Sequence, residues 1–471
     1  MNLNYVPARR LASLAAALFI LCTAAAHAGD LTALDRYVAA PDPSFRYTLN
    51  RTLNYSGMTV YQLDMVSQTW LTTAEVDRPE WHHWVTIYKP DKPSTSSVLL
   101  LIDGGSNTPN PPTPDPQMVL LAGSAGAILV DLGQVPNEPL TFAGETAPRS
   151  EDAIIAYTWD KFLRTGDERW PARLPMTKAA VRAMDAVTAF LGQLPGGAVT
   201  VKNFVVMGAS KRGWTTWSTA AVDPRVVAMA PLVFDSLNLE QAFAHHWEAY
   251  GAWSSAVQDY VKAGIMNWFG TPQMEALLEI EDPYNYRARM ALPTYQVAST
   301  GDQFFVPDSP RFYFSDMPGE KYLRFVPNTD HSLGSLSVIA NLLTWFQAVT
   351  SNDPRPRFYW TADRAGGNLT VRTIDTPTQV LLWQATNPKG RDFRLETIGA
   401  AWTSTPLTGA NGIYSVPLPS PVQGWTAYMI ELDFPGAGGG SLVFTTEVVV
   451  MPDIYPFPSP FPAPARLKRG R

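Results

Sequence analysis

The sequence predicts an α/β fold, a doubly wound and mainly parallel sheet with helices on both faces. Between Val98 and Val326, short apolar runs alternate with amphipathic stretches that have helical spacing. Continuous apolar runs are expected for strands that are covered on both faces. After Pro354-Arg355-Pro356 the pattern changes to short alternating strands separated by Pro, Gly and Asn. This second pattern predicts a small all-β, immunoglobulin-like sandwich over residues 355–450.

Residues 1–28 have the pattern of a secretory signal peptide. Arg9 and Arg10 precede an apolar stretch from Leu11 to Cys22, and small residues stand at Ala26 and Ala28. We therefore expect cleavage after Ala28 and a periplasmic or secreted protein. The arginine pair leaves twin-arginine export as an alternative to the general secretory route. The apolar stretch is short for a membrane anchor, so no stable span is expected after cleavage.

The composition excludes several function classes. The net charge of −6 provides no broad basic field, so nucleic acid is not an expected partner. Cys22 is the only cysteine and lies in the predicted signal peptide. The mature chain is therefore expected to have no disulfide, no thiol nucleophile and no cysteine-ligated metal. The hydrophobic share of 46% suits a globular chain with a large core.

The expected elements follow one another in a simple order. Residues 31–52 have helix-like spacing, and antiparallel strands are predicted at Met58–Leu63, Val66–Leu71 and Trp81–Lys89. The mainly parallel strands are predicted at Val98–Ile102, Ala127–Leu132, Phe204–Met207, Val226–Phe234, Thr294–Ala298 and Lys321–Val326. An amphipathic helix over Thr177–Leu194 leads into the third of these six strands.

A long insertion follows the fourth parallel strand. The stretch at about 235–290 is helical in pattern and rich in aromatic residues, and we predict that it caps a main domain over residues 29–354. Its aromatic side chains either form the cap's own core or line a substrate pocket as a lid, and the two roles are compatible. Residues 451–471 form a Pro-rich tail with a basic end, which we expect to be extended and mobile.

The segment Asn203–Trp217 combines a strand, a tight turn with a central serine and a helix. This is the context of a nucleophile elbow, which exposes a serine hydroxyl at the carboxyl end of the sheet. The usual spacing is G-x-S-x-G. Here Gly208 and Ser210 are followed by Arg212 at the place of the second glycine and by Gly213 one residue later. As a bare string this pattern is weak evidence for a nucleophile and is also found in structural turns. Whether Ser210 is a nucleophile therefore depends on whether it has catalytic partners.

A serine nucleophile needs a base and an acid that orients the base. His331 follows the sixth parallel strand, and Asp302 follows the fifth. The order serine, acid, histidine is that of the α/β-hydrolases, so Ser210, Asp302 and His331 are the predicted triad. Two rival acids exist. Asp235 follows the fourth strand, and Asp330 adjoins His331, so its side chain is expected to point away.

An oxyanion hole needs two donors near the serine. The backbone N–H of Lys211 is the first candidate, and the loop with Gly104 and Gly105 after the first parallel strand is expected to supply the second. Arg212 has two candidate roles, a salt bridge that seats the elbow helix or a grip on a substrate carboxylate. We assign Arg212 and Trp214 to the predicted substrate-binding set. The predicted chemistry requires no metal and no organic cofactor.

Four segments together resemble the PhoPQ-activated pathogenicity-related proteins: Thr69–Trp84, Asp103–Asn107, Gly208–Trp214 and Thr329–His331. The resemblance covers roughly residues 30–450, and Gly-Ala-Ser-Lys-Arg-Gly-Trp is its most specific part. It implies an exported α/β-hydrolase-like protein with a C-terminal β domain, of a kind found in bacteria and in some secreted eukaryotic proteins. It implies no settled substrate. The serine motif is also similar to that of carbohydrate esterases that act on glucuronoyl esters.

These observations predict an exported serine hydrolase that cleaves an ester or amide bond through an acyl-enzyme. The expected substrate is a small molecule, a carbohydrate ester or a peptide. Two alternatives stay open at this point. One is a secreted serine peptidase of the same fold, and the other is a non-catalytic binding or signalling protein on a hydrolase scaffold.

Overall fold

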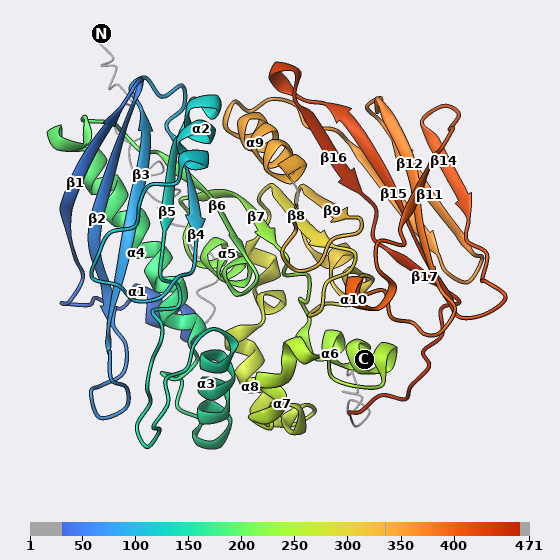
Figure 1. Cartoon of the computed structure of the whole chain (residues 1–471), viewed down its shortest axis with the longest axis horizontal. Helices are drawn as coiled ribbons and strands as arrows, with labels where there is room; N and C mark the ends of the chain where they lie inside the picture. The colour runs from blue at the N-terminus through green and yellow to red at the C-terminus, as the bar shows by residue number, and fades with distance from the viewer. Residues whose placement is uncertain (1–30, 335, 462–471) are drawn as a thin grey trace, which may run out of the picture.

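The computed structural model describes residues 31–334 and 336–461 (Figure 1). The predicted signal peptide and the basic end of the tail lie outside the described residues. Within the described part of the chain, no helix is both long enough and apolar enough to cross a membrane. The fold is α/β with a mixed sheet, which confirms the α/β part of the predicted class.

The N-terminal edge of the main sheet is antiparallel. It contains β1 (Arg46–Tyr55), β2 (Met58–Thr69) and β3 (Glu80–Pro90), which pair in sequence order. The two strands predicted over residues 58–71 are one long strand, β2, with a register shift between Val66 and Gln68. The helix expected over residues 31–52 is wrong in its second half, because α1 (Ala33–Ala39) ends early and β1 follows.

The centre of the sheet is parallel and matches the six predicted strands. They are β4 (Ser97–Ile102), β5 (Ile128–Leu132), β6 (Asn203–Ala209), β7 (Val226–Leu232), β8 (Thr294–Ser299) and β9 (Lys321–Val326). The spatial order is β3-β5-β4-β6-β7-β8-β9, with β5 antiparallel to β3. The carboxyl ends of the parallel strands therefore share one edge, where the predicted site residues follow β4, β6, β8 and β9.

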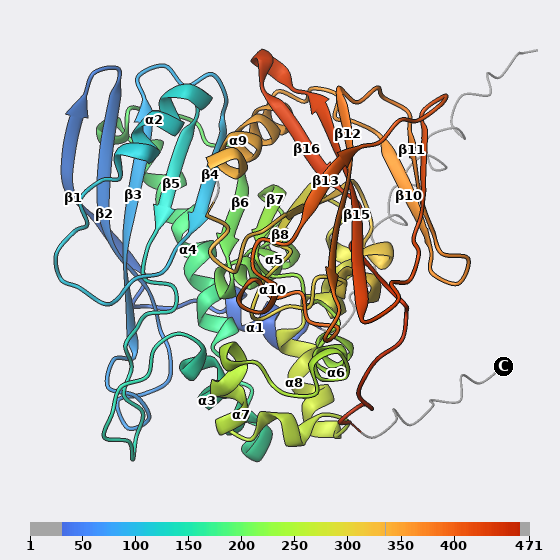
Figure 2. The ribbon, with the colours of Figure 1, turned by 45° about the vertical axis from the view of Figure 1, so that its right-hand side comes forward.

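Helices cover both faces of this sheet (Figure 2). On one face lie α3 (Asp152–Thr165), α4 (Arg173–Leu191) and α5 (Lys211–Val222), and on the other lie α2 (Pro116–Ala125) and α9 (Leu336–Thr350). Neighbouring residues of β6 show the alternation, because Val206 packs in the core with α4 and α5 whereas Val205 packs in the core with α2 and α9. Both side chains are fully buried.

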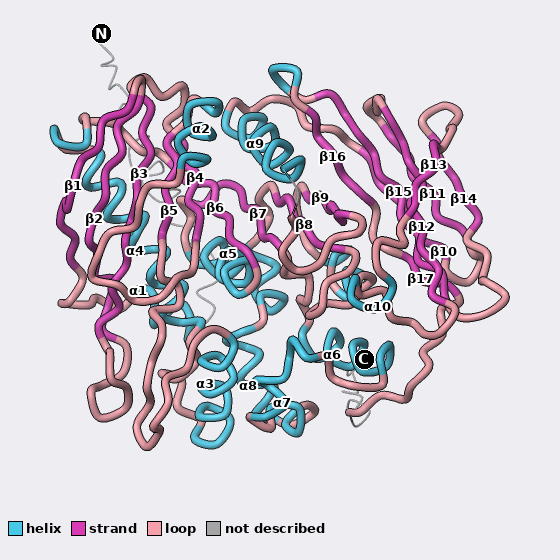
Figure 3. The backbone as a smooth tube through the Cα atoms, viewed as in Figure 1, coloured by secondary structure: helices cyan, strands magenta, loops and turns pink. Residues whose placement is uncertain are grey.

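The predicted cap lies between β7 and β8. It consists of α6 (Leu239–Tyr250), α7 (Gln258–Lys262), α8 (Pro272–Glu281) and short 3-10 segments. Figure 3 shows these helices gathered with α3 beyond one end of the central strands. Several cap aromatics pack on one another, including Phe243 on Tyr260 and on Phe269 at ring-centre distances of 6.4 and 5.1 Å. The cap therefore has an aromatic core of its own.

The C-terminal strands form two sheets. One contains β12 (Gln379–Asn387), β13 (Thr403–Pro406), β15 (Trp425–Pro435), β16 (Ser441–Thr445) and β17 (Val449–Met451), and the other contains β10 (Phe358–Asp363), β11 (Asn368–Thr373) and β14 (Ile413–Pro417). β16 lies beside β9, with Thr445 opposite Leu323, so the first of these sheets continues the central sheet. This contact covers the edge of β9, which would otherwise expose unpaired backbone groups.

The start of the Pro-rich tail packs on the cap. The Phe457 ring lies against Gly251, and the Phe461 ring stacks on Phe269 with ring centres 4.6 Å apart. Asp453 forms an ion pair with Arg311 at 2.7 Å. Up to residue 461 the tail therefore packs on the cap, through Phe457 on Gly251 and Phe461 on Phe269.

A buried ionic cluster joins the cap, the main domain and the C-terminal strands. The carboxylate of Asp308 accepts hydrogen bonds from Arg391 at 2.6 and 3.2 Å and lies 2.8 Å from Nε2 of His245 in α6. The side chains of all three residues have no exposed surface. Burial would raise the pKa of Asp308, but Arg391 and His245 outweigh it and hold that pKa well below its usual range. Asp308 is therefore a charged partner for two elements far apart in sequence.

We expect Asp308→Ala to destabilise the protein strongly. Removing one partner of a buried ion pair leaves the other charge uncompensated, which costs about 3–5 kcal/mol. Urea unfolding followed by tryptophan fluorescence measures the loss. The matched control is Asp375→Ala, which breaks the exposed ion pair with Arg357 and should shift the midpoint far less. Equal shifts in the two variants would contradict the proposed importance of the buried cluster.

Candidate active site

Ser210 lies at the turn between β6 and α5. Its backbone has φ 58° and ψ −126°, a strained conformation for a residue with a side chain. Two hydrogen bonds hold this conformation. The Ser210 N–H donates to the carbonyl of Leu232 at 2.9 Å, and the Ser210 carbonyl accepts from the N–H of Trp214 at 2.9 Å. The end of β7 and the first turn of α5 therefore fix the serine at the carboxyl edge of the sheet.

Two glycines allow this turn because the backbones approach closely. A Cβ atom on Gly213 would lie 2.7 Å from the carbonyl oxygen of Leu232, and a Cβ atom on Gly208 would lie 2.7 Å from the carbonyl oxygen of Arg212. Neither neighbour is a flexible side-chain end, so a side chain would push α5 away from the strands. The glycine displaced by one position in the sequence motif thus performs the close helix–strand packing that a nucleophile elbow requires.

Asp302 and His331 meet at the ends of β8 and β9. Nδ1 of His331 lies 2.7 Å from Oδ2 of Asp302, whose residue is 2% exposed. Oδ1 of Asp302 accepts from the N–H of Phe304 at 2.8 Å, and the N–H of His331 donates to the side-chain carbonyl of Gln303 at 3.1 Å. Both members of the pair are therefore held by the loop that follows β8.

The two rival acids are placed elsewhere. The carboxylate of Asp330 accepts from the N–H and the hydroxyl of Ser332 at 3.0 and 2.6 Å. Asp235 is buried, and its Oδ1 has no hydrogen-bond partner in the part of the chain that the structure describes. Of the three candidate acids, Asp302 alone is hydrogen-bonded to His331 within residues 31–334 and 336–461.

The other ring nitrogen of His331 is Nε2. This atom is buried and makes no hydrogen bond to the described residues, Ser210 included. The imidazole packs against the rings of Phe304 and Phe305 at 4.4 and 5.9 Å between ring centres. Both phenylalanines line the same cavity as Ser210, so the His331 ring packs on side chains of the cavity wall.

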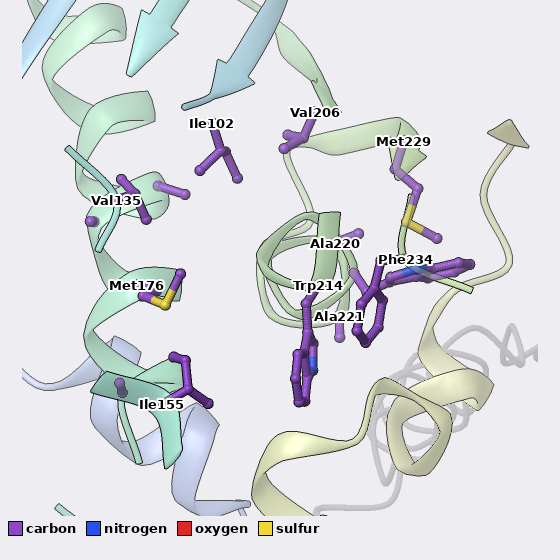
Figure 4. Close-up of a cluster of buried hydrophobic side chains, with 14 of the residues drawn as sticks. Ile102, Val135, Ile155, Met176, Val206, Trp214, Ala220, Ala221, Met229 and Phe234 are labelled. Atoms are coloured by element: carbon purple, nitrogen blue, oxygen red, sulfur yellow. The ribbon is translucent and has the colours of Figure 1, made fainter. Parts of the chain in front are cut away.

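The cavity beside Ser210 is small and mainly apolar. Its volume is about 50 Å³. Trp214 forms part of its wall and stacks on Phe234 with ring centres 4.7 Å apart (Figure 4). Cap residues supply the opposite wall, Phe243 of α6 and Tyr260 of α7 among them. The cap aromatics therefore pack on one another and also line this cavity.

Lys211 and Arg212 are tied to Glu151 at the start of α3. Nζ of Lys211 lies 2.5 Å from Oε2 of Glu151 and 3.3 Å from a carboxylate oxygen of Asp152. Arg212 donates to the Val135 carbonyl at 2.6 Å and to Oε1 of Glu151 at 2.8 Å. The structure thus places Arg212 in the salt bridge that seats the elbow helix, and it does not line the cavity as the predicted substrate-binding role requires.

The backbone N–H groups predicted to form the oxyanion hole have different surroundings. Lys211 is the first residue of α5, so its N–H has no intrahelical acceptor, and the residue lines the cavity. The N–H of Gly104 instead donates to Oδ1 of Asp103 at 2.7 Å, and Arg212 fills the space beside Gly104. Gly105 has φ 105°, a conformation that favours glycine. The Lys211 N–H is therefore free of an intrahelical acceptor beside the cavity, whereas the Gly104 N–H is bound to Asp103.

Sequence reasoning missed Glu138 and Glu151. Glu151 has φ 53° and ψ −131°, and its N–H donates to Oε2 of Glu138 at 2.6 Å. Burial raises the pKa of Glu138 to about 7. Burial would also raise the pKa of Glu151, but Arg212 and Lys211 outweigh it and lower that pKa to about 2. No strand end or motif marks these two positions, and only their contacts with the elbow identify them.

The pH dependence of stability tests whether the buried carboxyl of Asp235, one of the rival acids, is neutral. Burial, and then the nearby Asp302, raise its pKa well above the usual range. The folded protein keeps a proton that the unfolded chain releases near pH ~4, so this group lowers stability as the pH rises above that value. We expect the Tm of Asp235→Asn to fall less than that of the wild type between pH ~5 and ~8.

Asp330→Asn is the matched control, because hydrogen bonds from Ser332 lower the pKa of Asp330. The charged form of Asp330 stabilises the folded state above the unfolded pKa, so this variant should lose stability at neutral pH instead. Parallel Tm curves for the wild type and Asp235→Asn would contradict a buried neutral carboxyl at position 235.

Comparisons with known proteins place the chain in a family. The profile of the PhoPQ-activated pathogenicity-related protein family matches residues 34–394. Autocrine proliferation repressor protein A of Dictyostelium discoideum is 39% identical over 458 residues, which cover 91% of this chain and 92% of that protein. Among solved structures, an acetyl xylan esterase from Paenibacillus sp. R4 is 15% identical with a TM-score of 0.47, covering 68% of this chain and 92% of its own. A glucuronoyl esterase from Solibacter usitatus is 14% identical with a TM-score of 0.38, covering 67% and 89% respectively. The chain belongs to the PhoPQ-activated pathogenicity-related protein family.

Proposed function

We propose that this protein is an exported serine hydrolase of the α/β-hydrolase type that cleaves esters. The hydrogen bond of 2.7 Å between Asp302 and His331, whose ring packs on Phe304 and Phe305 in the wall of the cavity that Ser210 lines, carries the proposal. A strained serine at a strand–helix turn supports it, because such strain gathers at functional sites. The signal-peptide pattern of residues 1–28 supports export.

The residues present can perform acyl transfer in two steps. Oγ of Ser210 attacks the ester carbonyl carbon, and its proton passes to Nε2 of His331, while Asp302 accepts a hydrogen bond from Nδ1 and stabilises the imidazolium. The oxyanion of the tetrahedral intermediate accepts from the Lys211 N–H at the positive end of α5. His331 then donates its proton to the leaving alcohol, which leaves an acyl-Ser210. A water molecule activated by His331 repeats the sequence and releases the acid.

The mechanism requires Nε2 of His331 and Oγ of Ser210 to come within hydrogen-bonding distance. Nε2 is buried and has no other partner among the described residues, so no competing bond must break. Hydrogen bonds between catalytic groups are often long in unliganded enzymes and shorten in the complex with substrate. The second oxyanion donor must likewise come from the 103–105 loop, after Gly104 exchanges the Asp103 carboxylate for the substrate.

A second candidate function is signalling by a hydrolase scaffold without catalysis. The observation that favours it is the 39% identity to a relative whose name describes an autocrine repressor of proliferation. The two candidates differ in their dependence on Ser210. A signalling effect that persists in Ser210→Ala at full strength would favour the second candidate.

We expect Ser210→Ala to abolish the hydrolysis of p-nitrophenyl acetate, and Asp302→Asn to lower kcat by ~10⁴-fold, because an amide no longer favours the histidine tautomer that accepts the serine proton. Asp235→Asn and Asp330→Asn are the matched controls and should retain most of the activity. Circular dichroism checks that each variant is folded. If Asp235→Asn were the inactive variant and Asp302→Asn the active one, the assigned acid would be wrong.

A further inference from the structure

The cavity that Ser210 lines is closed by aromatic rings on several sides. Phe234, Phe243, Phe304 and Phe305 contribute to the wall together with Trp159, Trp214 and Tyr260. The volume of about 50 Å³ exceeds the roughly 10–15 Å³ that a cavity needs to hold one water molecule by only a few times. An acetyl or propionyl group is of this size, whereas a chain of eight carbon atoms is not.

The wall has little freedom to widen, because its rings are packed by further rings. Trp159 contacts Trp214 at 5.8 Å and Tyr260 at 5.4 Å between ring centres. Phe234 contacts Phe305 at 5.6 Å. Displacing one of these side chains would require the others to move, and close-packed interiors resist such movement. The cavity therefore sets a size limit for the group that enters it.

Three polar residues of the wall, Lys211, Tyr260 and His246, are occupied by the protein itself. Lys211 is paired with Glu151 and Asp152, and the hydroxyl of Tyr260 donates to Asp152 at 3.0 Å. His246 has its pKa lowered to about 3 by burial, so its ring is neutral, and the ring accepts from the N–H of Ser254 at 3.2 Å. A charged acyl group would therefore lose its hydration without gaining a partner from these residues.

We propose that the acyl group of the substrate is short and uncharged, with three or four non-hydrogen atoms, and that it enters the cavity that Ser210 and Phe243 line. This inference rests on the proposed function, because the acyl group is the part of the ester that remains on Ser210. The alcohol side of the ester must then lie outside the cavity, where the cap imposes no such limit.

Phe243 offers a test with a matched control in the same cluster. Phe243 lines the cavity, whereas Phe269 packs against Phe243 at 5.1 Å and does not line it. Wild-type kcat/KM should fall steeply from p-nitrophenyl acetate through butyrate to octanoate. We expect Phe243→Ala to raise the octanoate-to-acetate ratio of kcat/KM by ~10-fold or more, since pocket contacts discriminate by such factors for each methylene. Phe269→Ala should destabilise the protein similarly and leave the ratio unchanged.

Ala242→Val provides the opposite change. Ala242 also lines the cavity, and a larger side chain there should lower kcat/KM for butyrate more than for acetate. This variant keeps the test decisive if Phe243→Ala does not fold. A wild type that hydrolyses octanoate as well as acetate, or equal ratios in Phe243→Ala and Phe269→Ala, would overturn the inference alone. No hydrolysis of any ester, together with no reaction of Ser210 with a fluorophosphonate, would overturn the proposed function and this inference with it.

Discussion

The site depends on the close approach of α5 to the ends of β6 and β7. Gly208 and Gly213 leave no room for side chains at this contact, and the resulting turn forces Ser210 into its strained backbone conformation. Arg173 of α4 strengthens this contact through two interactions with α5. Its guanidinium donates to the Lys211 carbonyl at 2.7 Å and lies 4.2 Å above the ring of Trp214. The packing of two helices and two strands thus stabilises the strained backbone conformation of Ser210.

The same contact links the elbow to the cap. Arg173 also pairs with Glu281 at the end of α8, at 3.4 Å, and both side chains have no exposed surface. Nε1 of Trp214 donates to the backbone carbonyl of Glu281 at 2.5 Å. The cap is therefore anchored to the helix that carries the candidate nucleophile. The Asp308 cluster and the tail phenylalanines fix the far side of the cap to the C-terminal strands.

Much of the central fold could be predicted because its signals are local. The apolar runs of β4 to β9 were each found within a few residues, and the candidate triad followed from strand ends and chain order. The pairing of β16 with β9 could not be predicted, because it joins residues about 120 positions apart through one short contact. The packing of Phe457 and Phe461 on the cap is likewise a long-range contact with no local pattern.

The partners of Arg212 and Gly104 differ from the sequence-based prediction, whereas the pairing of Asp302 with His331 does not. The Asp302–His331 hydrogen bond agrees with the expected geometry, whereas Arg212 is bound to Glu151 and the Gly104 N–H is bound to Asp103. A motif gives the position of these groups in the chain, but competition among nearby carboxylates decides which partner each one takes. These bonds depend on the Glu151 side chain just before α3 and on the Val135 carbonyl in the loop after β5, which no local pattern connects to the elbow.

The central claim is that Ser210 is a nucleophile activated by His331. The most direct measurement is peptide mapping by mass spectrometry after reaction with a fluorophosphonate, which modifies activated serines. We expect one adduct, on the peptide that contains Ser210, formed at a rate that falls sharply in Asp302→Asn. An adduct on another serine, or a rate for Ser210 that does not depend on Asp302, would contradict it.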